Sequence, residues 1–137
     1  MAKIYKSTMT LRFFGDDLDP NEITSRLGCQ PTVGAKMGEV WTTARGAEKI
    51  ARTGTWRLDA NTLRPSDLNA QVAELLAPLN DDLSVWIDLT VRYKADVFCG
   101  IWMEQSNEGT DLSAKTLRNL GARGLPLEID IYDPSPD

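Results

Sequence analysis

The sequence predicts an α+β fold: a largely antiparallel sheet of four or five strands with three or four helices on one face, for which ferredoxin-like connectivity is one candidate arrangement. Segments in which apolar and polar residues alternate indicate strands with one buried face. Between them lie segments that begin with a capping residue and repeat apolar residues at helical spacing. The length of 137 residues fits one domain, which we place at residues 1–132, with a flexible C-terminal tail at residues 133–137.

The first strand and the first helix have clear local signals. Over residues 5–13 the odd positions are apolar, except Ser7, and the even positions are mostly polar, which predicts a strand with one buried face. A helix is predicted over 20–27, because it starts with proline and is followed by glycine. Asp19 is the expected N-cap, and Glu22 is expected to complete a capping box.

The middle of the chain is predicted to contain a long loop, a strand and a second helix. Glycines and a proline interrupt residues 29–53, so we expect a loop with a short strand around residues 39–42. Residues 55–59 alternate again and predict a second strand. Ser66 or Asp67 is expected to cap a helix whose apolar residues share one face: Leu68, Val72, Leu75, Leu76 and Leu79.

Residues 83–93 fit two structures. Their apolar residues alternate and several are β-branched, which favours a strand. The same segment follows a helix-start signal at residues 80–82 and offers a helical apolar face, formed by Leu83, Trp86, Ile87, Thr90 and Val91. The residues alone leave both structures open, and the composition favours the strand.

The last third of the chain predicts two strands around a helix. Residues 97–103 are apolar on both faces apart from a glycine, which is typical of a central strand. Residues 127–132 alternate and predict a half-buried strand. The helix between them is expected to start after Ser113, to end at Gly121, and to bury two leucines, Leu117 and Leu120.

The composition disfavours several kinds of catalysis. The chain has no histidine, which excludes a Ser-His-Asp triad, a Cys-His dyad and an imidazole metal site. Cys29 and Cys99 form no CxxC pair and lack a group that would activate a thiolate. The acidic cluster at residues 16–22 lacks the EF-hand pattern, and we interpret it as helix capping and a solvated loop. We expect no catalytic residue, metal or cofactor.

Charge and hydropathy restrict the partners and the location. Fifteen basic and 20 acidic residues give a net charge of −5, which argues against nucleic-acid binding but suits a basic protein partner. The N-terminus has no apolar run of the kind found in secretory signals. Apolar runs also fall short of the ~18 residues that a membrane span needs. We therefore expect a cytoplasmic protein without a membrane partner.

A series of short motifs spans roughly residues 5 to 132 in a characteristic order. They are Leu18-Asp19-Pro20, Leu27-Gly28, Pro31-Thr32, Lys36-Met37-Gly38-Glu39, Gly54-Thr55-Trp56, Phe98-Cys99-Gly100, Leu112-Ser113 and Asp130-Ile131-Tyr132. In these motifs the chain resembles a bacterial family of uncharacterised proteins, domain of unknown function 4279. The resemblance implies that residues 83–92 are helical. It implies no activity, cofactor or site residue.

One segment differs in charge from the rest of the chain. Residues 36–57 hold five basic and two acidic side chains, a local charge of +3, together with two tryptophans and three glycines. Guanidinium groups and flat rings on a flexible loop suit an anionic or aromatic ligand. In the alternative, the charges pair with the acidic remainder and the tryptophans pack in the core. The candidate ligand-binding residues are Lys36, Glu39, Trp41, Arg45, Arg52, Trp56 and Arg57.

Two aromatic side chains are candidates for an interface. Phe98 and Trp102 point to the opposite sheet face from Val97 and its alternate neighbours. If helices cover one face only, these rings form an exposed patch that suits a homodimer. In the alternative, the loop at residues 33–53 covers them.

The function favoured by these observations is a non-enzymatic domain that binds a small anionic ligand or a protein partner. The argument is that the sequence contains no assembled catalytic set. Two alternatives stay open. One is a small acidic inhibitor or immunity-type protein that neutralises a toxin, and the other is a small histidine-free hydrolase or isomerase.

Overall fold

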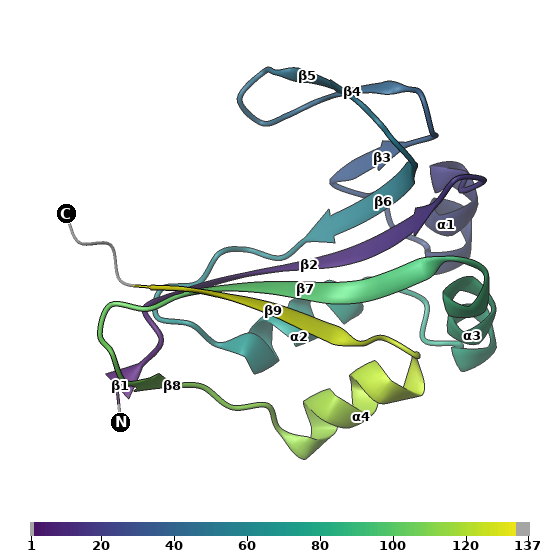
Figure 1. The fold of residues 1–137 in the computed structure, drawn as a ribbon. Helices are drawn as coiled ribbons and strands as arrows, with labels where there is room; N and C mark the ends of the chain where they lie inside the picture. The colour runs from purple at the N-terminus through teal and green to yellow at the C-terminus, as the bar shows by residue number, and fades with distance from the viewer. Residues whose placement is uncertain (1, 134–137) are drawn as a thin grey trace.

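A computed structural model describes residues 2–133, and within them helices cover one face of a five-stranded sheet (Figure 1). Three of its four strand pairs are antiparallel and the last pair is parallel, so the sheet is mixed and the predicted α+β class is confirmed. The strand order is β3 (Val33–Ala35), β6 (Gly54–Asp59), β2 (Lys6–Gly15), β7 (Lys94–Trp102) and β9 (Leu127–Tyr132).

The helices connect these strands. Helix α1 (Pro20–Leu27) follows β2, and α4 (Ala114–Ala122) forms the crossover between the parallel strands β7 and β9. Helices α2 (Leu68–Leu76) and α3 (Leu83–Arg92) both lie between β6 and β7 in the chain. Leaving aside the two small sheets, the elements from β2 to β7 follow the βαββαβ order of ferredoxin-like folds, with two helices in the second connection. Helix α4 and strand β9 extend this arrangement by one parallel strand. In Figure 1, α2 and α4 lie below the sheet, and α1 and α3 lie at one end.

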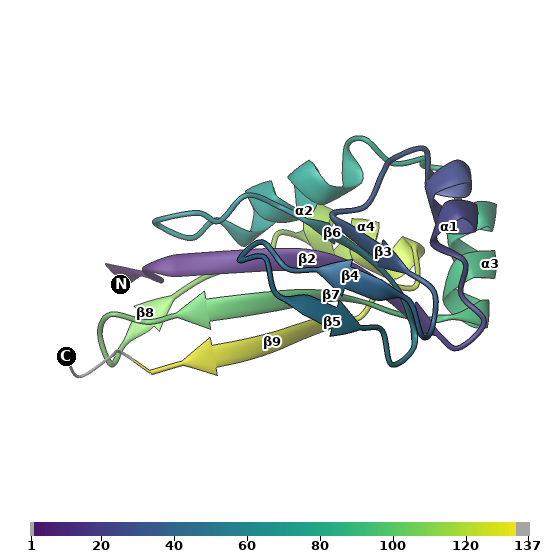
Figure 2. The ribbon, with the colours of Figure 1, turned by 90° about the horizontal axis from the view of Figure 1, so that it is seen from above.

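Two small sheets accompany the main one. Strand β1 (Ala2–Lys3) pairs with β8 (Glu108–Gly109), and β4 (Val40–Thr42) forms a hairpin with β5 (Glu48–Ile50). The strand expected around residues 39–42 is therefore present. Strands β3 and β5 were not expected within that loop. Figures 1 and 2 show that the hairpin stands over the sheet face opposite α2 and α4. Of the expected tail, residues 134–137 lie outside the described part of the chain.

Alternation in β2 places its odd-numbered side chains in the core beneath the helices. Met9, Leu11 and Phe13 are fully buried there, whereas Tyr5 precedes the strand and is exposed, contrary to expectation. Ser7, the polar exception, is also buried. Its Oγ donates to Oε1 of Gln71 (2.7 Å), and Nε2 of Gln71 donates back to the Ser7 carbonyl oxygen (2.9 Å). These bonds satisfy polar groups that would otherwise be costly to bury.

Three aromatic rings join the helices to the sheet. Trp56 lies edge-on to Phe13, with ring centroids 5.8 Å apart, and Trp86 packs against the same phenyl ring at 6.2 Å. Both indole N–H groups are satisfied: that of Trp56 donates to Thr24 Oγ1 (3.0 Å) and that of Trp86 donates to the Asn80 carbonyl (2.7 Å). Both tryptophans thus combine a large buried area with a fixed orientation.

Helix α1 begins and ends as predicted, but its capping box does not form. The Asp19 carboxylate accepts from the Asn21 N–H (2.9 Å), and Gly28 ends the helix at φ +80°. Glu22 turns away from the cap. Its carboxylate accepts two bonds from Arg92 (2.7 and 3.0 Å) and one from the Tyr93 hydroxyl (3.0 Å). A guanidinium is a stronger donor than one neutral N–H, so Glu22 links α1 to the end of α3.

Residues 83–92 form helix α3, as the resemblance implied and contrary to the strand that the composition favoured. Asp82 caps the helix by accepting from the Ser84 N–H (3.0 Å). Trp86 and Leu89 are buried, whereas Ile87 and Val91 are 55% and 80% exposed, so the expected helical face is also wrong in part. Strand propensity depends on context, and here the N-cap and the buried tryptophan outweigh it.

The last helix and strand deviate from the sequence expectation at their exposed sides. Ser113 caps α4 as predicted, but the helix continues through Gly121, and the glycine with positive φ is Gly124. Leu120 is buried, whereas Leu117 is 54% exposed. Strand β9 is mostly exposed rather than half-buried, because it lies at the edge of the sheet.

An ion pair joins three strands on the open face, the sheet face opposite the helices. Arg12 of β2 forms two parallel bonds with Asp96 of β7 (2.7 and 2.8 Å) and a further bond with Glu128 of β9 (3.2 Å). The Asp96 side chain is only 1% exposed. The hydrogen bond with Asp96, supported by both nearby carboxylates, raises the pKa of Arg12 and keeps it charged.

Replacing Asp96 by alanine is expected to destabilise the fold by about 1–3 kcal/mol, because Arg12 stays partly buried with only Glu128 as partner. Urea denaturation of Asp96→Ala measures the loss. The exposed carboxylate of Asp130 provides a matched control on the same face, and Asp130→Ala is expected to change stability by less than about 0.5 kcal/mol. Equal effects of the two variants would contradict the assignment.

The Glu22 contact predicts a pH-dependent stability difference. Hydrogen bonding from Arg92 lowers the pKa of Glu22, although burial opposes this shift. A carboxylate with a lowered folded-state pKa stabilises the fold above its unfolded pKa, and this contribution disappears as the pH falls through the folded value. Glu22→Gln is therefore expected to be less stable than the wild type at about pH 7, with a smaller difference at about pH 3.

Urea denaturation at both pH values measures this difference. Glu48→Gln, which changes an exposed glutamate of the β4–β5 hairpin, serves as the control and is expected to match the wild type at each pH. A Glu22→Gln difference that persists unchanged at the lower pH would show that the carboxylate charge is not responsible.

Candidate functional site

The open face of the sheet carries cationic and aromatic side chains in contact with each other. Nζ of Lys6 lies 4.2 Å from the ring centroid of Trp102, and that ring stacks on Tyr132 at 4.8 Å. The Arg12 guanidinium lies 4.5 Å from the Phe98 ring and 5.3 Å from Phe14. Such contacts are attractive and fix the orientation of both partners.

The two rings that the sequence suggested as an interface lie on this face. Phe98 and Trp102 are half-buried, whereas Val97 and Cys99 are fully buried on the helix side. The Trp102 ring lies so close over Gly100 that a Cβ there would be 2.8 Å from it. Arg12 lies over the Phe98 ring and Lys6 lies over the Trp102 ring, so a cation covers part of each ring. The homodimer expected through them stays a prediction.

A cavity of about 240 Å³ lies between the β4–β5 hairpin and the open face. Phe14, Thr55 and Arg57 form its wall on the sheet side, together with Val33. The opposite wall is formed by Trp41 of β4 and by β5 with the residues that follow it. The remaining lining residues are Lys49, Ile50, Ala51, Arg52 and Thr53. The lining therefore includes three basic side chains and no acidic one.

The Arg57 guanidinium lies 5.5 Å from the Trp41 ring centroid, and its Nε is buried without a hydrogen-bond partner among residues 2–133. Arg123, beside Trp86, also has a buried Nε without a hydrogen-bond partner in this part of the chain, but its guanidinium donates to the Asn119 carbonyl (3.1 Å). Arg57 is the arginine in this state that lines a cavity.

By contrast, Arg12, Arg26 and Arg92 each pair with carboxylates. Within the described residues, no ion pair joins Arg57 to a carboxylate.

The position of Arg57 in the sheet brings it close to a second cation. In the β2–β6 pairing it lies directly opposite Arg12. Like charges at opposed positions repel each other, but Asp96 and Glu128 neutralise Arg12 from the other side. The charge of Arg57 has no carboxylate partner among residues 2–133, so Arg57 can bind an incoming anion.

The structure divides the predicted ligand-binding residues into three groups. Trp41, Arg52 and Arg57 line the cavity. Trp56 is fully buried on the helix side and cannot reach a ligand on the open face. Arg45 lies in the exposed turn at the tip of the hairpin.

Lys36 and Glu39 form a local turn instead of lining the cavity. The Glu39 carboxylate accepts from the backbone N–H of Lys36 (2.6 Å). Nζ of Lys36 lies 3.9 Å from the carboxylate of Asp19, the residue that caps α1. These contacts hold the chain between β3 and β4 and give both residues a structural role.

Seven of the cavity residues were not among the candidates from the sequence: Phe14, Val33, Lys49, Ile50, Ala51, Thr53 and Thr55. For Phe14 a signal existed. Phe13 and Phe14 are adjacent in an alternating strand, so one of the two rings must lie on the face opposite the core. For Val33 and Ile50 no local signal existed, because the β3–β6 pairing places Val33 and the fold-back of the hairpin places Ile50.

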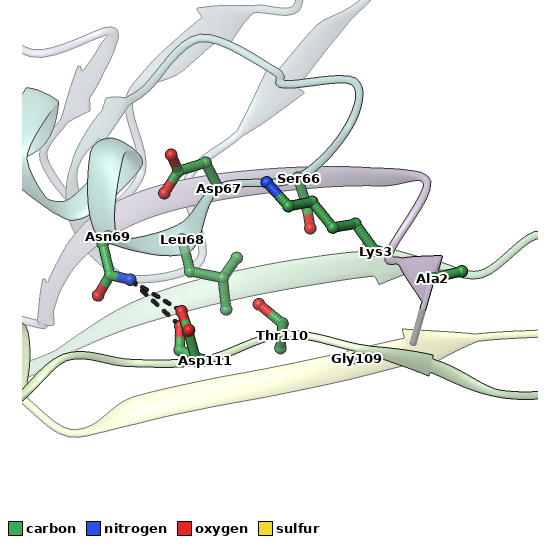
Figure 3. A pocket seen from close by; sticks show the side chains of 9 residues that line it. All are labelled: Ala2, Lys3, Ser66, Asp67, Leu68, Asn69, Gly109, Thr110 and Asp111. Atoms are coloured by element: carbon green, nitrogen blue, oxygen red, sulfur yellow. Dashed lines mark hydrogen bonds between the residues drawn. The ribbon is translucent and has the colours of Figure 1, made fainter.

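A larger cavity, of about 480 Å³, lies where α2 begins beside β1 and β8 (Figure 3). Its polar groups already serve the fold. Asp67 caps α2 by accepting from the Ala70 N–H (3.0 Å). The Asn69 amide donates to the Asp111 carboxylate (3.1 Å) and accepts from the Ser113 N–H (2.9 Å). These bonds fasten the segment before α4 to α2, so we assign this cavity a structural role.

The buried thiol and the acidic cluster that the sequence offered as candidates lie in structural environments. Burial raises the pKa of the Cys99 thiol to about 11, which keeps it protonated and unreactive at neutral pH. In the acidic cluster, Asp19 caps α1 and Asp16 accepts from the Thr53 hydroxyl (2.9 Å). Among residues 2–133, no group of three or more cysteines and carboxylates is close enough to hold a metal ion.

One structural finding bears on membranes. No helix within residues 2–133 has the length and apolar character needed to cross a bilayer.

Comparison with known proteins gives one match. No curated protein and no solved structure matches the chain. One family model, described as a domain of unknown function (DUF4279), matches residues 3–134, almost the whole sequence. This confirms the resemblance indicated by the motifs. The chain belongs to the DUF4279 family.

Proposed function

We propose that this protein is a non-enzymatic binding domain that holds a small anionic ligand in the cavity beneath the β4–β5 hairpin. The observation that carries the proposal is Arg57, a guanidinium beside an aromatic ring, with a buried Nε that has no hydrogen-bond partner among the described residues. An unsatisfied buried donor costs free energy, about 1–3 kcal/mol for a neutral group and more for a charged one.

A ligand anion would give Arg57 what Asp96 gives Arg12. Carboxylates and phosphates accept two parallel bonds from one guanidinium, and such bonds are among the strongest in proteins. Lys49 and Arg52 line the same cavity and add positive potential beside Arg57. A ligand with one negative group therefore has three cations within one small site, in a protein whose net charge is −5.

The remaining walls suit a flat apolar portion of the ligand. Trp41 and Phe14 supply aromatic rings from the hairpin and the sheet, and Val33 and Ile50 supply aliphatic contacts. The cavity volume of about 240 Å³ is below the range of about 300–1,000 Å³ that is typical of drug-sized ligands. The ligand class is thus a small aromatic or aliphatic acid, or its phosphate counterpart.

The same residues support binding without turnover. The cavity lining offers arginine, lysine and threonine side chains but no carboxylate, cysteine or histidine that could act as general base or activated nucleophile. Such a set can orient and neutralise an anion. The expectations of a cytoplasmic location and of no nucleic-acid partner accompany this proposal and rest on the sequence.

Ligand titrations with the probe 2-naphthoate and its neutral amide test the site. We expect naphthoate to bind at least about tenfold tighter than naphthamide, because a charge-assisted hydrogen bond contributes roughly 1.5–3 kcal/mol. Arg57→Gln is expected to weaken naphthoate binding about tenfold and to leave naphthamide binding nearly unchanged. Isothermal titration calorimetry measures both affinities.

Arg45→Gln provides the matched control, because it makes the same change at the exposed tip of the same hairpin. It is expected to bind naphthoate as the wild type does. The proposal fails if the two glutamine variants bind naphthoate equally, or if the wild type does not distinguish the acid from the amide.

A further inference from the structure

Strand β9 forms a free edge of the main sheet. It is the last strand in the sheet order and pairs only with β7 among the described residues. The N–H of Val97 donates to the Pro126 carbonyl (2.9 Å), and the N–H of Met103 donates to the Tyr132 carbonyl (3.2 Å). Since successive residues of a strand point their backbone groups to opposite sides, the even-numbered residues face β7.

The backbone groups of Leu127, Ile129 and Ile131 therefore point away from the sheet. The same three residues carry the apolar side chains of β9. In register they lie beside Val97, Cys99 and Ile101, which are fully buried. Ile129 and Ile131 are nevertheless 43% and 64% exposed. The row of apolar side chains that is buried in β7 is therefore partly exposed in β9. It lies next to the backbone N–H and C=O groups that point away from the sheet.

The other side of β9 is acidic. Glu128 and Asp130 lie on the open face, beside Phe98 and Gly100 in register. Glu128 contacts Arg12 but keeps 51% of its side chain exposed, and Asp130 is exposed as well. An added strand would meet two carboxylates on one side and two isoleucines on the other.

A second copy of this chain fits the edge poorly in the registers that pair most of β9. In a symmetric antiparallel pair, each residue lies opposite one on the same face. A pair centred on Ile129 opposes Glu128 to Asp130, and pairs centred on Glu128 or on Asp130 oppose that acid to itself. Like charges at opposed positions destabilise a sheet, and edge charges are a common protection against self-association.

We propose that β9 is a docking edge for an extended segment of a protein partner in which basic and apolar residues alternate. The segment adds a sixth strand: its backbone pairs with Leu127, Ile129 and Ile131, its basic side chains lie beside Glu128 and Asp130, and its apolar side chains cover the isoleucines. The six residues of β9 offer an edge about 20 Å long, a usual length for strand addition. The opposite edge, β3, has only three residues.

This inference is independent of the hairpin cavity, since it uses other residues at the far edge of the sheet. It gives the alternative of an acidic inhibitor a defined surface. An edge that takes a basic strand suits a basic partner, and attraction over a distance speeds association with such a partner.

Two synthetic peptides of about eight residues test the edge: one alternates lysine with valine, the other glutamate with valine. We expect the lysine peptide to bind about tenfold tighter at low salt, because two opposed pairs change from repulsive to attractive. Hydrogen exchange followed by NMR is expected to show new protection at the amides of Leu127, Ile129 and Ile131. Amides of β3 and of the hairpin are expected to remain unchanged.

Two variants sharpen the test. Asp130→Lys is expected to reduce the preference for the lysine peptide about tenfold or reverse it, whereas Asp81→Lys, which changes an exposed aspartate in the loop before α3, retains the preference. Ile129→Pro removes an outward N–H without breaking a bond to β7, so it is expected to abolish binding and keep the fold. Far-UV circular dichroism and the wild-type NMR shifts of β2 verify that fold.

Several results would overturn the proposal. Equal affinity for the two peptides, or equal effects of Asp130→Lys and Asp81→Lys, would exclude charge-selective docking. Protection at amides other than those three would place the peptide elsewhere. Concentration-dependent protection of the same amides in the protein alone would show that a second copy occupies the edge, and the partner chemistry proposed here would be wrong.

Discussion

Strand β2 lies at the centre of the sheet, and its alternation divides the molecule into two faces with different chemistry. Its odd-numbered residues fill the core beneath the helices, and its even-numbered residues are therefore held on the opposite face. Within residues 2–133 no helix covers that face, so its charges and rings must satisfy one another. The contacts of Arg12 with Asp96, and of Lys6 with Trp102, follow from this constraint.

Two arginines at opposed positions show how the open face combines stability with recognition. Arg12 is neutralised by carboxylates from β7 and β9, so its charge contributes to holding three strands together. Arg57 lies beside Trp41 of the hairpin, and no ion pair among the described residues uses its charge. The hairpin thus forms one wall of an open cavity at one end of the sheet face, whereas elsewhere on that face Arg12 and Lys6 contact carboxylates and rings of the sheet itself.

The sequence determines most of the fold through local signals, and it fails where tertiary contacts decide. Alternation in β2 and the caps Asp19, Asp67 and Ser113 were sufficient to place four elements. For α3, the β-branched residues suggested a strand. Some of them, such as Val91, lie on the exposed side of the helix, and nothing in the local sequence indicates that they are exposed. At the site, composition indicated Trp41, Arg52 and Arg57. Alternation over residues 55–59 indicates that Trp56 points inward, and the structure confirms this, whereas no local signal places Trp41.

The parallel crossover through α4 has a consequence for synthesis on the ribosome. Strand β7 pairs with β2 as soon as both have emerged, but its second neighbour follows only after the segment from Met103 to Pro126. During that interval the nine-residue strand β7 is itself the outer edge, and it carries the most buried residues on that side of the sheet. Long unpaired edges of this kind promote aggregation of nascent chains. The addition of β9 through α4 therefore removes an edge at which nascent chains could aggregate.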